Sequence, residues 1–189
     1  MFKLLVIDID GVLTDGKYVD IDGKSVLKKF EDKDWTSIKK FKSCGIPVVA
    51  ISGDLWNKNI MERRNIPFYC SKREDGFLDK ASFLPILEKE YNVSRNDIAY
   101  VGDDYFDLDI MKLVGYPFCP KDSDTDVILY CDTFHKQFNS SSPYVLDKKG
   151  GKGVIGSLFE VCKYVFRLKI PDDLDWIIRK IDSMATCQN

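Results

Sequence analysis

The feature that most limits the possible folds is a series of short, mostly apolar runs, each followed by polar or small residues. Four such runs occur, at residues 3–7, 47–51, 67–70 and 98–101. Runs of this length are typical of strands buried on both faces of a parallel sheet. Four other segments have apolar residues at three- and four-residue spacing, which predicts helices with one buried face, at residues 35–42, 57–64, 80–91 and 108–114.

This alternation predicts an α/β fold, a doubly wound (Rossmann-like) parallel sheet with helices on both sides. In such folds, ligands bind beyond the carboxyl ends of the strands. The polar or small residues at those ends are Asp8, Asp10, Ser52, Gly53, Gly102, Asp103 and Asp104. We therefore expect one crevice with carboxylates contributed by separate strands.

Residues 17–30, between the first strand and the first helix, partly alternate between apolar and polar around the pair Asp22-Gly23. That pair is a strong signal for a two-residue hairpin turn. We predict a β-hairpin flap after the first strand. Because isolated hairpins are only marginally stable, the flap should pack against its own active site or a neighbouring subunit.

The C-terminal part has fewer strand signals. Residues 120–149 are rich in turn formers and predict loops around one or two short strands. Gly150, Gly151 and Gly153 precede a predicted apolar helix at 154–166, and an amphipathic helix is expected at about 172–184. We expect one domain over residues 1–168, a length that a single core supports, and a C-terminal helical tail over 169–189.

Charge and cysteine usage narrow the classes of partner. The 28 basic and 30 acidic residues give a net charge of -2 without a basic stripe, so we expect no nucleic-acid partner. Neither a signal peptide nor an apolar stretch of about 20 residues is visible, so no membrane partner is expected. The six cysteines form no CxxC pair and His135 stands alone, which disfavours zinc and suits a reducing, cytoplasmic location.

Two pairs of aspartates, Asp8 with Asp10 and Asp103 with Asp104, indicate a cation-binding site. Burying both Asp8 and Asp10 is costly unless a cation or a shared proton compensates, and Mg²⁺ prefers such oxygen ligands. Alone, this pair is better explained as turn or capping aspartates. Asp103 and Asp104 favour the cation site over the capping explanation, because two acidic strand ends of one parallel sheet meet in one crevice. Asp107 adds a carboxylate one helical turn later.

Two further residues suit phosphate binding. The Ser52 hydroxyl and the Gly53 amide can hold a phosphate oxygen near a helix start, although such a serine is more often only a cap. Lys80 can reach the same crevice as a point charge, although a lysine in that position is usually a solvated surface residue.

In this order, Asp8-x-Asp10-Gly11-Val12, Ser52-Gly53, Lys80 and Gly102-Asp103-Asp104 with Asp107 resemble the four motifs of the haloacid dehalogenase superfamily. The resemblance implies a Mg²⁺-dependent phosphomonoesterase in which Asp8 forms an aspartyl-phosphate and Asp10 acts as acid, then base. It implies metal binding by Asp8, Asp103 and the backbone carbonyl of Asp10. Lys80 and Ser52 would orient phosphate oxygens, and Asp104 and Asp107 would orient metal-bound waters.

Residues 8–16, the hairpin and Gly150-Gly151-x-Gly153 are similar to the capless branch that includes 3-deoxy-D-manno-octulosonate 8-phosphate phosphatase, over about residues 4–162. This implies no large cap domain and a small acidic sugar phosphate as the substrate. It also implies a homotetramer in which the flap and tail of one subunit help cover a neighbour's site. The branch also contains phosphatases of nonulosonate 9-phosphates and domains fused to cytidylyltransferases.

The chain departs from the octulosonate pattern at several positions. Asp54 replaces an arginine, which together with Arg64 is more like the nine-carbon branch. Trp35 replaces a glycine and is expected to narrow the pocket, residues 133–143 look inserted, and the usual arginine near Gly156 is missing. The predicted substrate-binding residues are Thr14, Ser52, Gly53, Asp54 and Arg64.

Two other functions remain open at this point. A polynucleotide 3'-phosphatase could use the same motifs, because fold and motifs do not define the leaving group, but the chain lacks a basic groove. A non-catalytic regulatory or assembly domain of a sugar-activating cytidylyltransferase system is the second alternative. The intact set of Asp8, Asp10, Lys80 and Asp103 disfavours it.

Overall fold

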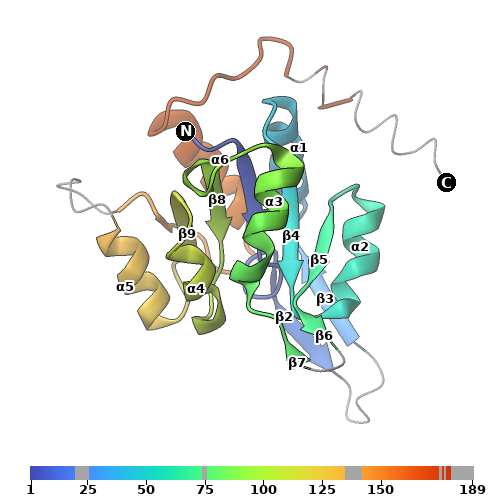
Figure 1. Cartoon of the computed structure of the whole chain (residues 1–189). Coiled ribbons are helices and arrows are strands. Elements are labelled where there is room, and N and C mark those ends of the chain that lie inside the picture. The colour runs from blue at the N-terminus through green and yellow to red at the C-terminus, as the bar shows by residue number, and fades with distance from the viewer. Residues whose placement is uncertain (20–25, 74–75, 135–141, 175, 177, 180–189) are drawn as a thin grey trace.

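The computed structural model describes the chain except for residues 20–25, 74–75, 135–141, 175, 177 and 180–189 (Figure 1). The predicted Asp22-Gly23 turn, His135 and most of the predicted last helix therefore lie outside the described residues, and the division into domain and tail stays a prediction. Among the residues that are described, no helix is both long and apolar enough to cross a membrane.

Six parallel strands form one sheet in the order β10-β9-β8-β1-β4-β5 (Figure 1). Their bounds are β1 Leu4–Ile7, β4 Val48–Ser52, β5 Phe68–Cys70, β8 Ile98–Val101, β9 Tyr116–Pro120 and β10 Val145–Leu146. In the centre, Leu5 of β1 lies opposite Val48 on one side and Ala99 on the other. All of β1 is buried, as its unbroken apolar run requires. The prediction of a doubly wound α/β sheet is confirmed.

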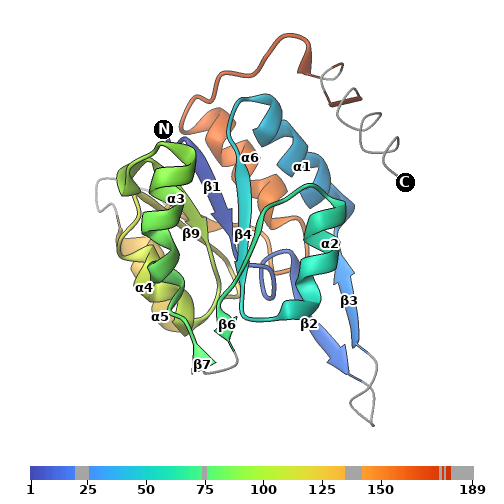
Figure 2. The same ribbon diagram turned by 45° about the vertical axis from the view of Figure 1, so that its right-hand side comes forward.

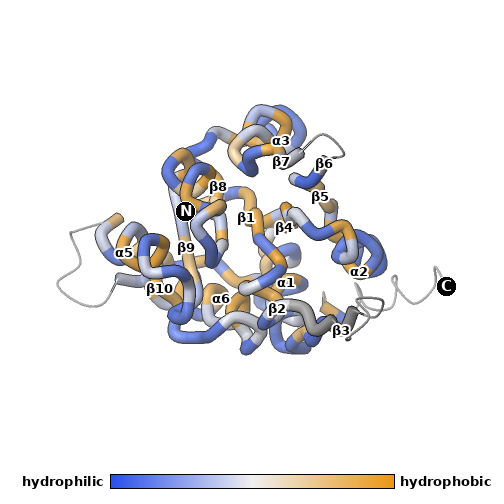
Figure 3. The backbone as a smooth tube through the Cα atoms, turned by 90° about the horizontal axis from the view of Figure 1, so that it is seen from below, coloured by the Kyte–Doolittle hydropathy of each residue, from blue (hydrophilic) through white to orange (hydrophobic). Residues whose placement is uncertain are grey.

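Helices cover both faces of this sheet. α1 (Asp32–Ser43) and α6 (Val154–Tyr164) lie side by side on one face, and α3 (Leu84–Tyr91) lies on the other (Figure 2 and Figure 3). The other helices are α2 Lys58–Arg63, α4 Leu108–Met111 and α5 Thr125–Thr133, with 3-10 turns at Leu55–Asn57, Lys80–Phe83, Arg95–Asp97 and Tyr105–Asp107.

α1 and α6 are joined by a buried carboxylate. Asp34 Oδ1, on α1, accepts hydrogen bonds from the backbone amides of Ile155 at 2.7 Å and Gly156 at 3.2 Å. The first amides of a helix have no partner within it, so Asp34 satisfies two of them at the start of α6.

An antiparallel strand pair, β2 (Thr14–Val19) and β3 (Val26–Phe30), extends beyond the carboxyl end of β1 (Figure 1). Thr14 lies opposite Phe30 and Tyr18 opposite Leu27. The paired strands of the predicted hairpin therefore begin before residue 17. A second short pair, β6 (Lys72–Arg73) with β7 (Gly76–Phe77), lies at the same end of the molecule (Figure 1).

The prediction of loops over residues 120–149 is wrong in part, because α5 lies there between β9 and β10. Its buried face consists of Val127 and Cys131, so the helical signal is weak, and turn-forming residues follow closely. Strand β9 is also absent from the prediction. It contains Pro117 and Pro120, and sequence rules place proline at sheet edges rather than inside a sheet.

The glycine-rich segment before α6 packs against the loop that follows β1. A Cβ atom on Gly150 would lie 2.2 Å from the carbonyl oxygen of Gly11. The amide of Gly151 donates to the carbonyl of Val12 at 2.9 Å. A larger residue at position 150 would push this loop away, so the glycine helps to place the residues at the end of β1.

Candidate active site

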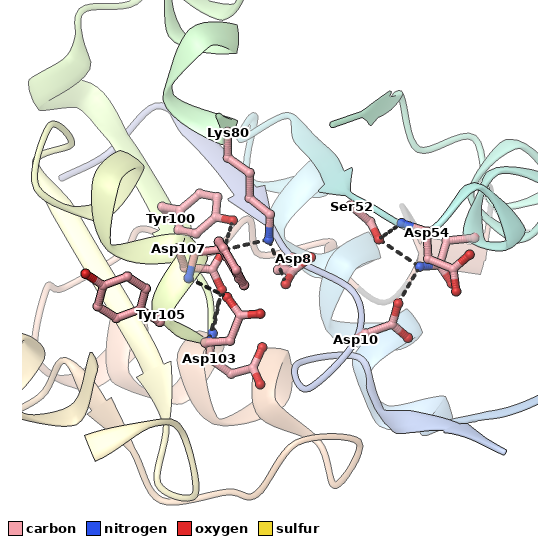
Figure 4. A network of polar contacts seen from close by, with 12 residues as sticks. Asp8, Asp10, Ser52, Asp54, Lys80, Tyr100, Asp103, Tyr105 and Asp107 are labelled. Atoms are coloured by element: carbon pink, nitrogen blue, oxygen red, sulfur yellow. Dashed lines mark hydrogen bonds and ion pairs between the residues drawn. The ribbon is translucent and has the colours of Figure 1, made fainter. Parts of the chain in front are cut away.

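Three neighbouring strands end in polar residues at one edge of the sheet. β4, β1 and β8 are adjacent and parallel, so Ser52, Asp8 and Asp103 gather at their carboxyl ends (Figure 4). A cavity of about 350 Å³ opens there, and its lining includes Asp8, Asp10, Ser52, Gly53, Asp54, Lys80, Asp104 and Phe106. The single crevice expected from the sequence therefore exists.

Asp8, Asp103 and Asp107 form a carboxylate cluster in which one oxygen of each lies within 4.8 Å of the others. Asp107 is fully engaged, because its Oδ1 accepts from Lys80 at 2.7 Å and from Tyr100, and its Oδ2 accepts from the Asp103 amide at 2.9 Å. Asp103 differs, since its Oδ1 is buried without a hydrogen-bond partner among the described residues. An orphaned carboxylate oxygen beside Asp8 fits a hard divalent cation.

Lys80 is buried rather than solvated at the surface. Its Nζ lies 2.9 Å from Asp8 Oδ2 and 2.7 Å from Asp107 Oδ1 (Figure 4). Burial by itself lowers the pKa of a lysine, but the charges of Asp8 and Asp107 outweigh it and raise the pKa of Lys80. Lys80 therefore remains an ammonium and presents a fixed positive charge beside the Asp8 carboxylate.

The acidic cluster has more negative than positive charge when all its carboxyls are ionised. Burial raises the pKa of Asp8 to about 7, opposed by the charge of Lys80 and reinforced by that of Asp107. Burial also raises the pKa of Asp103 to about 8, with added repulsion from Asp8 and Asp107. A divalent cation would supply the missing positive charge, in agreement with the oxygen donors present.

Glycines in both acidic motifs allow the carboxylates to approach. Gly11 has a φ of +83°, and a Cβ atom there would lie 1.8 Å from Asp103 Oδ2. A Cβ atom on Gly102 would lie 2.4 Å from the carboxyl carbon of Asp107. Only glycine meets both demands at position 11, so the motif glycines are part of how the site is built.

Asp10 points across the cavity, away from the acidic cluster (Figure 4). Lys28 Nζ, from β3, contacts its Oδ1 at 2.7 Å and its Oδ2 at 2.8 Å. Asn57 Nδ2 donates to Asp10 Oδ2 at 2.9 Å, and Thr14 Oγ1 donates to Asp10 Oδ1 at 3.2 Å. The Asp10 side chain is thus separate from the cation cluster, so its predicted metal role depends on its backbone carbonyl.

Ser52 and Asp54 both cap the turn after β4. Ser52 Oγ accepts from the Asp54 amide at 3.1 Å and from Asn57 Nδ2 at 3.0 Å. Asp54 Oδ1 accepts from the Trp56 amide at 3.1 Å, and its Oδ2 lies 2.9 Å from Lys28 Nζ. Ser52 therefore caps this turn, and both side chains also line the cavity, so the predicted phosphate contact of Ser52 stays a prediction.

Comparison with known proteins identifies the family. The sequence model described as haloacid dehalogenase-like hydrolase matches residues 74–142. The 3-deoxy-D-manno-octulosonate 8-phosphate phosphatase of Escherichia coli K12 is 30% identical over 162 residues, covering 85% of this chain and 77% of that protein. The chain belongs to the haloacid dehalogenase-like hydrolases.

Solved structures of such hydrolases agree with this assignment. The 3-deoxy-D-manno-octulosonate 8-phosphate phosphatase of Yersinia pestis has a TM-score of 0.71 at 25% identity, covering 92% of this chain and 84% of that one. The cobalt-bound form of the Haemophilus influenzae octulosonate 8-phosphate phosphatase has a TM-score of 0.69 at 27% identity, with coverages of 86% and 87%. The predicted resemblance is confirmed, and this haloacid dehalogenase-like hydrolase is a phosphatase.

Three residues of this hydrolase's site, Lys28, Asn57 and Tyr100, are missing from the set predicted from the sequence. Lys28 faces inward between the exposed residues Leu27 and Lys29. Because side chains alternate between the two sides of a strand, this alternation is the sequence signal that could have indicated an inward-facing Lys28. Asn57 ends the turn that Ser52 begins, and nothing local distinguishes it from an ordinary helix-start residue. Tyr100 lies within an apolar strand and is explained equally well as core.

Of the residues predicted to contact the substrate, Thr14 and Arg64 are not among those that line the cavity, and neither is Trp35. Trp35 is buried and packs on Phe30, with ring centroids 5.2 Å apart, so it belongs to the core rather than the pocket. The guanidinium of Arg64 lies 4.8 Å from the Trp35 ring centroid, an arrangement stabilised by cation–π attraction. Arg64 therefore contacts the core in this structure, and its predicted substrate contact stays a prediction.

Proposed function

We propose that this chain is a magnesium-dependent phosphomonoesterase that hydrolyses a small acidic sugar phosphate through an aspartyl-phosphate on Asp8. The observation that carries the proposal is the buried Asp8 carboxylate, 2.9 Å from the Lys80 ammonium and clustered with Asp103. A carboxylate beside a fixed cation suits attack on a negatively charged phosphoryl group, because the cation compensates the charge that gathers there.

The residues that would hold Mg²⁺ are Asp8, Asp103 and the backbone carbonyl of Asp10. When bound, the ion would neutralise charge on the phosphoryl oxygens during transfer. The unpartnered Asp103 Oδ1 supports this assignment, as does the cobalt-bound relative. Asp107 would act indirectly, by orienting Lys80 and the Asp103 amide, and Asp104 would orient metal-bound water.

The reaction is proposed in two steps. In the first, an Asp8 oxygen bonds to phosphorus, the bond from phosphorus to the sugar oxygen breaks, and Asp10 gives that oxygen a proton. In the second, Asp10 takes a proton from water, the water oxygen bonds to phosphorus, and the bond to Asp8 breaks, releasing inorganic phosphate. Lys80, the Ser52 hydroxyl and backbone amides would orient the remaining phosphoryl oxygens.

The proposed substrate is of the 3-deoxy-octulosonate 8-phosphate or nonulosonate 9-phosphate type. The named activity of the relatives supports the first, and Asp54, in place of an arginine, supports the second. Phe106 lines the cavity and is exposed, so it offers an apolar face to the carbon atoms of a sugar. We also propose a cytoplasmic homotetramer in which the flap and tail help cover a neighbouring site.

Phosphate release from a substrate panel tests this proposal against its alternatives. The panel contains octulosonate and nonulosonate phosphates, nucleotides and a 3'-phosphorylated oligonucleotide, each with Mg²⁺ and with chelator. We expect Mg²⁺-dependent release from a sugar-acid phosphate. Preference for the oligonucleotide would indicate a polynucleotide 3'-phosphatase, and no turnover of any compound would favour a non-catalytic module.

A further inference from the structure

A buried ammonium group connects the β2–β3 hairpin to the cavity. Lys28 Nζ, on β3, has four oxygen atoms within hydrogen-bond distance: both carboxylate oxygens of Asp10 at 2.7 and 2.8 Å, Asp54 Oδ2 at 2.9 Å and Asn57 Oδ1 at 2.8 Å. The Lys28 side chain is 7% exposed. An ammonium has three N–H donors, so this one is fully engaged in binding residues of the site.

The contacts of Lys28 fix the direction of the Asp10 carboxylate. Lys28 contacts both carboxylate oxygens of Asp10. Asn57 Nδ2 donates a hydrogen bond to Oδ2 at 2.9 Å, and Thr14 Oγ1 donates one to Oδ1 at 3.2 Å. Thr14 opens β2 and Lys28 lies on β3, so both strands of the hairpin contribute. The hairpin therefore helps to build the surroundings of Asp10.

The charges explain why this position needs a cation. Asp10 and Asp54 both reach Lys28, so the ammonium separates two carboxylates that would otherwise repel each other inside a partly buried site. Without Lys28, the Asp10 carboxylate would keep only its hydrogen bonds from Asn57 and Thr14 among the contacts described above.

We propose that Lys28 is a positioning residue that holds Asp10 for the second step of the reaction, and this inference rests on the proposed function. In that step Asp10 accepts one proton from water, the water oxygen bonds to phosphorus, and the electron pair of the breaking bond returns to Asp8. The products are inorganic phosphate and the free Asp8 carboxylate. Lys28 is not among the residues that line the cavity, so it acts through Asp10, which does line it.

p-Nitrophenyl phosphate separates the two steps, because its leaving group departs without a proton and so makes little demand on Asp10 as an acid. In a single turnover with excess enzyme and Mg²⁺, nitrophenolate release reports the first step and inorganic phosphate release reports the second. For Lys28→Met we expect unchanged nitrophenolate release and phosphate release slowed about tenfold to a hundredfold. Lys28→Arg, which keeps the charge, should restore much of the phosphate rate.

Lys29→Met is the matched control, since Lys29 is the exposed neighbour on the same strand, and both rates should stay unchanged. Asp10→Asn sets the reference for full loss of the second step. Circular dichroism checks that each variant folds. If Lys28→Met does not fold, Lys28→Gln is measured in its place. Because Gln is uncharged, it should show the same selective slowing.

Equal slowing of both steps in a folded, uncharged Lys28 variant would overturn the inference. Lys28 would then only stabilise the hairpin, and the proposed function would stand. Unchanged phosphate release would overturn it as well. If wild-type protein with Mg²⁺ releases neither product from p-nitrophenyl phosphate and no phosphate from the sugar-acid phosphates of the panel, the proposed function fails, and the positioning role fails with it. A selective loss in the second step, rescued by arginine, supports the inference.

Discussion

Replacing Asp103 by asparagine should stabilise the protein without Mg²⁺ at neutral pH and abolish its stabilisation by Mg²⁺. Burial and the charges of Asp8 and Asp107 raise the pKa of Asp103 to about 8, and its Oδ1 has no partner among the described residues. Asparagine has nearly the same shape and no charge. The variant therefore removes a repulsive carboxylate and, at the same time, a cation ligand.

The sign of the pH dependence follows from the protons bound in each state. The unfolded chain loses the Asp103 proton near pH 3.8 and the native protein near pH 8, so the native state binds more protons between these values. The stability of the wild-type protein therefore falls as pH rises through that window, by at most about 4 kcal/mol at pH 7. Solvent screens the partly exposed carboxylate, so we expect Asp103→Asn to gain about 2 kcal/mol.

Thermal unfolding followed by circular dichroism measures this gain. In chelator at pH 7.5, the Tm of Asp103→Asn should exceed that of the wild type by roughly 4–8 °C, and by less at pH 5. Addition of Mg²⁺ should raise the Tm of the wild type but not that of the variant. Asp132→Asn removes an exposed carboxylate on α5 and serves as the control, with little change at either pH.

Two results would refute this reasoning. A Tm of Asp103→Asn below that of the wild type in chelator at both pH values would mean that the carboxylate is not repelled by its neighbours. An unchanged response of the variant to Mg²⁺ would mean that Asp103 does not bind the cation.

Three further substitutions have defined outcomes. Asp8→Asn should lower turnover by at least about three orders of magnitude because it removes the nucleophile, and wild-type rates in steady-state phosphate release would exclude a covalent route through Asp8. Lys80→Met should lower kcat about 10²- to 10³-fold, measured in the same assay, because it removes the fixed charge beside Asp8. Gly11→Ala should abolish the Mg²⁺-induced Tm increase, since the added Cβ would lie 1.8 Å from Asp103 Oδ2; an unchanged increase would contradict the close packing.

The parts of the fold that sequence rules predict correctly are those with a strong local signal. β1, β4 and β8 are uninterrupted apolar runs because both faces of each strand are covered. α5 and β9 were missed because their local signals conflict with their tertiary roles. α5 buries only Val127 and Cys131, and β9 contains two prolines, yet both are held in place by packing against the sheet.

The same distinction applies to the site. Asp8, Ser52 and Asp103 were predictable because each lies at the carboxyl end of a parallel strand, where the fold itself brings residues together. Arg64 was assigned to substrate binding from the resemblance to the nine-carbon branch. In the structure its guanidinium stacks on Trp35. A residue's place on a helix does not define the direction of a long side chain.

The sequence by itself determined the strands β1, β4, β5 and β8, the helices between them and the acidic residues at the strand ends. The reason is that burial on both faces and the direction of parallel strands act on short segments. Only the tertiary structure decided which side chains complete the site. Lys28 lies 18 positions from Asp10 in the sequence and Asn57 lies 47 positions from it, so these contacts depend on the paths of the hairpin and the turn. Lys80 likewise becomes a buried ammonium only because Asp8 and Asp107, far apart in the chain, supply the charges that offset its loss of water.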